Sequence, residues 1–477
     1  MHSIRTYAIY GLFLLVIFVL IIVSSPQENR NRYHNIDHYY KLTQEQMKRD
    51  LDFLQKMITE VHPKTYGGVP PEIRQAMQQA YQEIEQIDNV WQFYFVTQQV
   101  MNSLKDGHSS ILRPSEKIIE QLPFTYQWLE EGLYVTSSTG WLHKGDKIIE
   151  IGGKNEQELI EMLQSFVSYD NVHDLKRRTN TERLLTIGPY LEYFGLADGH
   201  KVQVTVERSG KIILGEVDIQ LRTNQPYPES NLFQYRVYKE DDLAVFRIDS
   251  FSPFNEYNKR VIQSFFETVR KEGVHHAAID LRYNDGGTTM FGDYILSFLE
   301  IPSYRNLKTA VRYSAVVSQR VTGKPIDKDE MLYFESDPIP VKTHENTFTG
   351  KLYIITSLDT YSAATALATV VKDNGIGMIV GEAPGGKPSS YGDILSFELP
   401  ESKFRLFISF KWIERPYTTL KNRYEDALQP DIYVPTTYED LAQGRDPQLE
   451  MIKKLIREER SRSPSHHSLH LPITMVL

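Results

Sequence analysis

The stretch Lys351–Gly381, KLYIITSLDTYSAATALATVVKDNGIGMIVG, contains two short apolar runs on either side of a longer segment. KLYIIT and IGMIVG have the length of buried strands, and the apolar residues between them recur at helical spacing. A strand, a helix and a second strand in this order are typical of parallel pairing, so the stretch predicts an α/β core. Ser362 stands where the turn after the first strand becomes the helix.

The same alternation occurs upstream of this stretch. LAVFRID, which begins at Leu243, and HHAAIDLR predict strands, and KRVIQSFFETVRK between them predicts a helix. Its apolar residues fall on one face: Val261, Ile262, Phe265, Phe266 and Val269. We therefore expect the α/β core to extend over residues 228–446.

The segments around this core have other patterns of apolar and turn residues. Helical spacing from Leu42 to Met101 predicts a small helical domain over residues 37–112. Short strands and glycine turns then follow in an order that resembles a PDZ module over residues 113–222, a fold that captures free carboxyl termini along a strand edge. The stretch after Met162 is longer than such a module needs, so we expect an insertion there. Residues 447–477 predict an amphipathic helix and a flexible tail.

The amino-terminal segment has the pattern of a membrane anchor. An uncharged run from Tyr7 to Ser25 is long enough to cross a bilayer, and Pro26 directly after it disfavours cleavage as a signal peptide. We expect a cytoplasmic n-region at residues 1–6, a transmembrane anchor at residues 7–25 and a linker at residues 26–36.

The composition narrows the possible functions. Lys and Arg total 53 against 62 Asp and Glu, a net charge of -9, and there is no basic stripe with interleaved aromatic residues. We therefore expect no nucleic-acid partner. The chain has no cysteine, which excludes disulfides, thiol nucleophiles and cysteine-ligated metals, and we expect no metal site.

Ser362 and a glycine-rich loop are candidates for catalysis. At the start of a helix, the helix dipole and free N–H groups stabilise a developing oxyanion, although a serine there can equally serve as an N-cap. DLRYNDGG (Asp280–Gly287) follows a predicted strand, and its paired glycines allow N–H groups to approach a substrate carbonyl closely. An ordinary turn is the alternative interpretation of this loop.

Lys387, in GEAPGGKPSSYGD, is the nearest candidate base in the sequence. Its alternative role is that of an exposed loop lysine. The segment Gly381–Lys387 also fits G-x-x-x-x-G-K, but Pro388 follows in place of the Ser or Thr that would hold magnesium. We therefore do not predict nucleotide binding.

Four segments occur in a recognisable order around the PDZ-like module: LKDGHSSI, DLRYNDGG, YSAATALATVVKDNG and IVGEAPGGKPSSYGD. Together they resemble the carboxyl-terminal processing (tail-specific) serine peptidases and their tricorn-core relatives, from about Asp37 to Asp446. The resemblance implies a crotonase-like α/β peptidase core, an extracytoplasmic location and no cofactor.

The resemblance also implies roles for individual residues. Ser362 corresponds to the nucleophile and Lys387 to the general base, and the N–H groups of Ala363 and of Gly286 or Gly287 line the oxyanion hole. The processing peptidases orient their lysine with a glutamine four residues later, where this chain has Tyr391, whose phenol is the candidate replacement.

His108 in LKDGHSSI offers a competing base. The resemblance to the tricorn-like branch implies a catalytic Ser-His pair, with the histidine in such a segment and a carboxylate nearer the carboxyl terminus. Histidine is also the commoner base near neutral pH. A serine precedes that histidine in the tricorn-like proteins, whereas here Gly107 does. Asp106 is expected to orient the imidazole or to cap a turn. The remaining alternatives for His108 are a structural, hydrogen-bonded histidine and a histidine that positions the ligand.

These observations predict a single-pass protein of the cell membrane with an extracytoplasmic serine endopeptidase domain. A Ser-Lys dyad is favoured over Ser-His, and the expected substrates are proteins or peptides with accessible C-terminal tails. The alternative is a catalytically inactive protein that binds peptides or ligands on the same fold.

Overall fold

The computed structural model describes residues 40–114, 118–223, 232–419, 422 and 425–462. The predicted anchor at residues 7–25 and the predicted tail lie outside these ranges. None of the helices in the described ranges is long and apolar enough to span a membrane.

A six-stranded sheet forms the centre of the carboxyl-terminal half. Its order is β11 (Phe233–Tyr238), β12 (Leu243–Ile248), β13 (His276–Asp280), β18 (Lys351–Thr356), β19 (Gly377–Gly381) and β22 (Ile432–Tyr433). The strands from β12 to β22 are parallel, and β11 is antiparallel to β12. All five residues of β13 are buried, as expected for a parallel strand covered on both faces.

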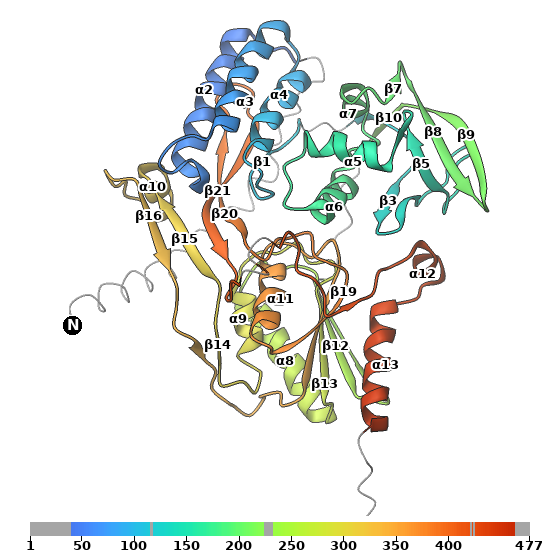
Figure 1. Cartoon of the computed structure of the whole chain (residues 1–477), viewed down its shortest axis with the longest axis vertical. Coiled ribbons are helices and arrows are strands. Elements are labelled where there is room, and N and C mark those ends of the chain that lie inside the picture. Colours follow the sequence, from blue (N-terminus) through green and yellow to red (C-terminus); the bar gives the residue numbers. More distant parts are fainter. Residues whose placement is uncertain (1–39, 115–117, 224–231, 420–421, 423–424, 463–477) are drawn as a thin grey trace, which may run out of the picture.

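Helices cover both faces of this sheet (Figure 1). One face carries α8 (Glu256–Glu272), α9 (Met290–Leu296) and α11 (Ala363–Asp373), whose apolar residues share a core with the strands. The other face carries α13 (Pro447–Arg462), which buries Ile452 and Ile456 against the sheet. The chain therefore forms a three-layer α/β core, and the amphipathic helix predicted after residue 446 is one of its layers.

A second sheet connects this core to the amino-terminal helices. It contains β1 (Ser110–Ile111), β21 (Arg405–Glu414), β15 (Lys308–Tyr313), β16 (Glu330–Phe334) and β20 (Ser390–Glu398). The helices are α2 (Gln44–Val61), α3 (Pro71–Glu83) and α4 (Val90–Asn102). Asp50 on α2 accepts hydrogen bonds from the N–H groups of Glu401 and Ser402, next to β21, so the helices and this sheet are packed as one unit.

A third sheet occupies the region predicted to be PDZ-like. It contains β3 (Tyr126–Leu129), β4 (Gly132–Val135), β5 (Lys147–Ile151), β6 (Lys154–Asn155), β7 (Ala197–Asp198), β8 (Lys201–Arg208) and β9 (Lys211–Asp218). Its helices are α5 (Glu156–Gln164), α6 (Val172–Glu182) and α7 (Gly188–Tyr193). The stretch after Met162 thus contains α6 and α7.

The chain enters this module through β2 (Ile118–Gln121) and leaves it through β10 (Gln220–Thr223), and these two strands pair with each other. The PDZ-like identity of this module stays a prediction.

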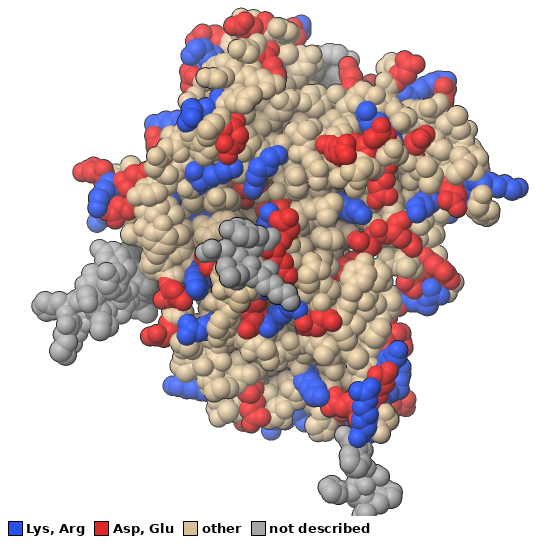
Figure 2. Space-filling view, in the orientation of Figure 1, with Lys and Arg blue, Asp and Glu red and all other residues tan. Residues whose placement is uncertain are grey.

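The remaining elements are short. They are α10 (Ala315–Thr322), α12 (Tyr438–Gln443), β14 (Ser303–Tyr304), β17 (Ile339–Pro340) and the 3-10 turns Pro63–Thr65 and Ile84–Gln86. Basic and acidic side chains are interspersed over the face of the molecule that Figure 2 shows. This face therefore has mixed charge.

We expect α13 to stabilise the core through its buried side chains. Replacing Ile452, which is fully buried against the sheet, with alanine leaves a cavity and should lower the free energy of unfolding by about 3 kcal/mol. Lys454→Ala, on the exposed face of the same helix, is the matched control. Urea titration checks both variants, and equal midpoints for Ile452→Ala and the unmodified protein would contradict the docking of α13.

Candidate active site

Ser362 occupies a strained turn between β18 and α11. Its backbone has φ 51° and ψ −123°, in a region that non-glycine residues rarely adopt and that costs roughly 1–3 kcal/mol. Its side chain makes no capping hydrogen bond, and its hydroxyl has no hydrogen-bond partner within the described ranges. The N-cap alternative therefore does not explain this serine, and its hydroxyl is free to react.

The loop after β13 holds this turn in place. The N–H of Tyr361 donates to the carbonyl of Asn284 at 2.9 Å, and the hydroxyl of Thr360 donates to the carbonyl of Leu281 at 2.9 Å. Both loops leave the carboxyl ends of neighbouring parallel strands, where such loops meet. The strain at Ser362 is thus maintained by hydrogen bonds to the Asp280–Gly287 loop.

Of the two glycines of that loop, Gly286 lies against Ser362 and Gly287 lies against Phe251. A Cβ on Gly286 would lie 2.6 Å from the Cβ of Ser362 and 3.0 Å from the nitrogen of Ala363, so no other residue fits there. The N–H of Gly286 donates to Asn284 Oδ1 at 2.8 Å. Among the described residues, the N–H groups of Gly287 and Ala363 have no acceptor. These two donors are the ones available to an oxyanion.

Lys387 lies near the turn but faces a carboxylate. The preceding residue, Gly386, packs so closely that a Cβ there would lie 3.1 Å from the nitrogen of Ser362. The ammonium of Lys387 is 3.1 Å from Asp426 Oδ1, and its side chain is 30% exposed. An ammonium in an ion pair cannot accept a proton. In the described structure, Lys387 makes no contact with the hydroxyl of Ser362.

Tyr391 packs among aromatic rings. Its ring centroid lies 4.5 Å from that of His62 and 4.9 Å from that of Trp412. Burial raises the pKa of its phenol to about 12. Tyr391 and Lys387 line one cavity of about 290 Å³, but no hydrogen bond joins them in the described structure.

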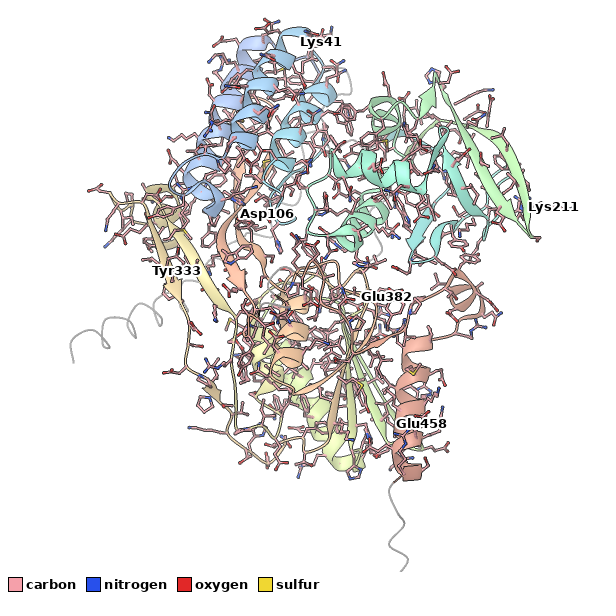
Figure 3. The ribbon with its side chains drawn as sticks, in the orientation of Figure 1. Lys41, Asp106, Lys211, Tyr333, Glu382 and Glu458 are labelled. Carbon is pink, nitrogen blue, oxygen red and sulfur yellow. The ribbon has the colours of Figure 1, made fainter. Side chains whose placement is uncertain are left out.

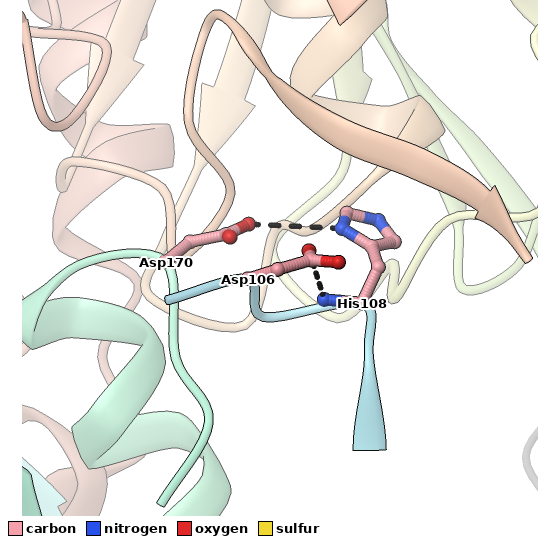
Figure 4. Close-up of side chains that lie close together, drawn as sticks. All are labelled: Asp106, His108 and Asp170. Atoms are coloured by element: carbon pink, nitrogen blue, oxygen red, sulfur yellow. Dashed lines mark hydrogen bonds and ion pairs between the residues drawn. The ribbon is translucent and has the colours of Figure 1, made fainter. Parts of the chain in front are cut away.

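His108 lies beside Tyr361, the residue that precedes Ser362. Its ring stacks on Tyr361 at a centroid distance of 4.7 Å, and its side chain is 12% exposed. Its Nδ1 lies 3.2 Å from the hydroxyl oxygen of Tyr361 and 3.8 Å from Asp170 Oδ2 (Figure 4). With the proton on Nδ1, facing these two oxygens, Nε2 is left as an acceptor.

Asp106 holds the loop that carries His108. It lies at the junction of the amino-terminal helices and β21 (Figure 3). Its carboxylate accepts the N–H of His108 at 2.9 Å, the hydroxyl of Ser109 at 2.5 Å and the His62 imidazole at 3.1 Å. Burial raises its pKa, but the bond from His62 and the neighbouring imidazoles outweigh burial and hold the pKa well below its usual range. Asp106 therefore caps the turn and does not contact the imidazole of His108.

The residues that surround His108 from the insertion were not predicted from the sequence. Asp170 Oδ1 accepts the N–H of Gly107 at 2.9 Å, and Arg178 donates to the carbonyl of Gly107. The guanidinium of Arg177 lies 4.2 Å from the centroid of the Tyr361 ring. A Cβ on Gly107 would lie 2.6 Å from the Tyr361 hydroxyl, which explains the glycine at this position. The unusual length of the insertion was the available signal.

Asp106, His108 and Asp170 are close enough to share a cation, since their ligand atoms lie within 4.8 Å of one another. Three donors already occupy the carboxylate of Asp106, so hydrogen bonding accounts for its position. The arrangement as a whole supplies a reactive hydroxyl, two oxyanion donors and a nearby imidazole, which is the equipment for acyl transfer.

Glu382 makes the site region sensitive to pH (Figure 3). Burial raises its pKa to about 7, against the opposing effect of the N–H of Thr436, which donates to it at 2.8 Å. Because the folded state holds this proton more tightly than the unfolded chain, its stabilising contribution is complete below pH 4.5 and is lost as the pH rises through about 7.

We expect Glu382→Gln to remove this dependence. Urea midpoints measured near pH 5 and pH 8 should show the unmodified protein losing stability relative to Glu382→Gln at the higher pH. Glu300→Gln alters an exposed carboxylate and should show no such divergence. If the urea midpoints of the unmodified protein and of Glu382→Gln differed by the same amount at both pH values, the raised pKa of Glu382 would be refuted.

Residues 242–434 match the model of peptidase family S41, and a search of curated proteins finds no match. The crystal structure of mature CPAF is 15% identical, with a TM-score of 0.62 over 88% of this chain and 99% of that one. Mature CPAF complexed with lactacystin is 16% identical, with a TM-score of 0.63 over 88% of this chain and 98% of that one. At these identities the two structures show a shared fold.

The family match spans the strands β12 to β22, the Asp280–Gly287 loop and Ser362. It confirms the resemblance to the carboxyl-terminal processing peptidases that the four segments indicate. The α/β core of this chain, residues 242–434, is therefore similar to peptidase family S41.

Proposed function

We propose that this protein is a membrane-anchored serine endopeptidase that hydrolyses peptide bonds of extracytoplasmic proteins, without a cofactor. The observation that carries the proposal is the strained backbone of Ser362, with its free hydroxyl beside two N–H groups that have no acceptor in the described structure. The uncharged run at residues 7–25 supports the anchor and the cell-membrane location.

In the proposed reaction, Ser362 Oγ attacks the substrate carbonyl and its proton passes to a base. The N–H groups of Ala363 and Gly287 hold the oxyanion. The base then gives the proton to the leaving amine, and water attacks the acyl-enzyme with the help of the same base, which releases the acid and regenerates the serine.

We propose His108 as this base in place of Lys387. His108 stacks on the neighbour of the nucleophile and directs Nδ1 at two oxygens, which leaves Nε2 to accept a proton. Lys387 is paired with Asp426. The family resemblance alone had favoured the lysine, whereas the side-chain contacts favour the histidine.

The PDZ-like module is proposed to bring C-terminal tails to the site. A cavity of about 570 Å³ is lined by Gln121–Gln127 from the module and by Asp359, three residues before Ser362. Arg222 also lines it, and its charge suits a peptide carboxylate. The cavity thus connects a peptide-sized surface of the module to the turn that carries the nucleophile.

One observation favours the alternative, a catalytically inactive protein that binds peptides. Among the described residues, neither His108 nor Lys387 makes a hydrogen bond to the hydroxyl of Ser362. A base that never approaches Ser362 would leave a binding surface without turnover.

Ser362→Ala should abolish proteolysis. With the full-length chain in non-ionic detergent and an unstructured protein as substrate, cleavage should fall by more than about a thousandfold. Ser303→Ala, which alters an exposed serine, should retain full activity. A fluorophosphonate probe should label the unmodified protein and fail to label Ser362→Ala. Labelling that persists in this variant would disprove the assignment of the nucleophile.

The two candidate bases should differ in their pH profiles. A histidine base gives activity that rises near pH 6.5, and a lysine base gives activity that rises well above neutral pH. We expect His108→Ala to lower kcat by at least about a hundredfold, and Lys387→Met to lower it only a few-fold. The reverse ranking in a cleavage assay over about pH 6 to 10 would assign the role to Lys387.

A further inference from the structure

A second cavity, of about 300 Å³, lies where three parts of the protein meet. Helix α4, the segment that follows His108, and the insertion each contribute to its wall. The lining residues are Tyr94, Gln98, Ser110, Ile111, Leu112, Arg113, Pro114, Phe166, Val167, Ser168, Arg178, Glu182 and Leu184. None of the catalytic candidates lines this cavity, so it is separate from the proposed active site.

Two buried polar atoms in its wall have no partner. Nη1 of Arg113 and Oγ of Ser168 are both inaccessible to water and form no hydrogen bond. Ser168 is 1% exposed. In the part of the chain that the structure describes, the guanidinium of Arg113 has neither a hydrogen bond nor an ion pair. A buried polar atom without a hydrogen-bond partner is costly, so this wall is suited to a ligand that supplies a partner to each of these two atoms.

The aromatic hydroxyls beside Arg113 confirm where its charge acts. Tyr94 and Tyr190 share a hydrogen bond of 3.0 Å. Burial raises the pKa of Tyr190, and the charge of Arg113 acts against it. Glu182 acts on the pKa of the same phenol in the opposite direction, so Arg113 and Glu182 oppose each other there.

The charges of the lining select the ligand. Arg178 also faces the cavity, but Asp174 and Glu182 lie 3.1 and 3.6 Å from its guanidinium. Because Arg178 is paired with both carboxylates, the charge left for a ligand in this lining is the single positive charge of Arg113. A monoanion balances this charge, whereas a dianionic phosphate would meet the repulsion of Glu182.

Much of the remaining wall is apolar, although Gln98 and Ser110 also line it. Ile111, Phe166, Val167 and Leu184 are each buried, with exposures of 1 to 4%. A ligand that places an anionic group between Arg113 and Ser168 would thus have apolar surface around its remaining atoms.

We propose that this cavity binds a monocarboxylate with a short apolar chain, either a free acid or the carboxyl terminus of a peptide that ends in an apolar residue. Arg113 pairs with the carboxylate and Ser168 donates its hydroxyl to it. The ligand connects the segment after His108 to the insertion. This site goes beyond the proposed peptidase activity and does not depend on it.

Isothermal titration calorimetry on the full-length chain in non-ionic detergent tests the site. Hexanoate represents a free acid, and N-acetyl-leucine represents a peptide carboxyl terminus. N-acetyl-leucinamide has the same apolar group without the charge, and inorganic phosphate has a different anion. We expect saturable binding of at least one carboxylate, none of the amide, and at least tenfold weaker binding of phosphate. The tighter of the two carboxylates identifies the source.

Variants locate the binding. Arg113→Met should weaken carboxylate binding at least tenfold, Arg113→Lys should retain part of it, and Ser168→Ala should weaken it several-fold. Arg270→Met removes an exposed guanidinium on α8 and should leave the affinity unchanged. Ser168→Ala removes one buried atom, so it keeps the test decisive if Arg113→Met fails to fold.

Three results would overturn the proposal. These are no saturable binding of either carboxylate, equal affinity in Ser168→Ala and the unmodified protein, and phosphate binding as tight as that of the carboxylates. Loss of proteolysis in Ser362→Ala bears on the peptidase activity alone, so failure of the two proposals can be distinguished.

Discussion

The arrangement of the site depends on one constraint, the left-handed backbone of Ser362. A serine adopts this conformation only where its surroundings impose it, and here three loops at the carboxyl ends of β13, β18 and β19 do so. The turn is held by the hydrogen bond from Tyr361 to Asn284 and by the close approach of Gly286, in the loop after β13. Gly386, in the loop after β19, also packs closely against it. The parallel sheet is what brings these loops together, because consecutive strands end at the same edge.

The imidazole of His108 is held by a different part of the chain. Its loop is capped by Asp106 from within, whereas the contacts of Gly107 come from Asp170 and Arg178 in the insertion. Tyr361 connects the turn that carries Ser362 to the loop that carries His108. It directly precedes Ser362, its ring stacks on His108, and the guanidinium of Arg177 lies over the same ring. The geometry of the site is therefore shared between the α/β core and the module inserted before it.

The α/β core and Ser362 could be predicted from the sequence because their signals are local. Apolar runs give the strands, and the order of strands and helices places Ser362 and the Asp280–Gly287 loop at one edge. The choice between Gly286 and Gly287 could not be predicted, because it depends on the side chain of Asn284 taking one of the two N–H groups. Asp170 was missed for a related reason, because its contact with Gly107 depends on how the module docks and leaves no periodic pattern. The packing of α13 on the far face of the sheet is likewise a tertiary property that an amphipathic pattern does not specify.

The pairing of β2 with β10 has an evolutionary consequence. Because Ile119 faces Arg222 across this ladder, the module enters and leaves the rest of the chain at neighbouring points, and a segment with adjacent ends can be gained by a gene without stretching its host. Because Asp170 and Arg178 provide the contacts of Gly107, deletion of the same segment would leave the histidine loop without them.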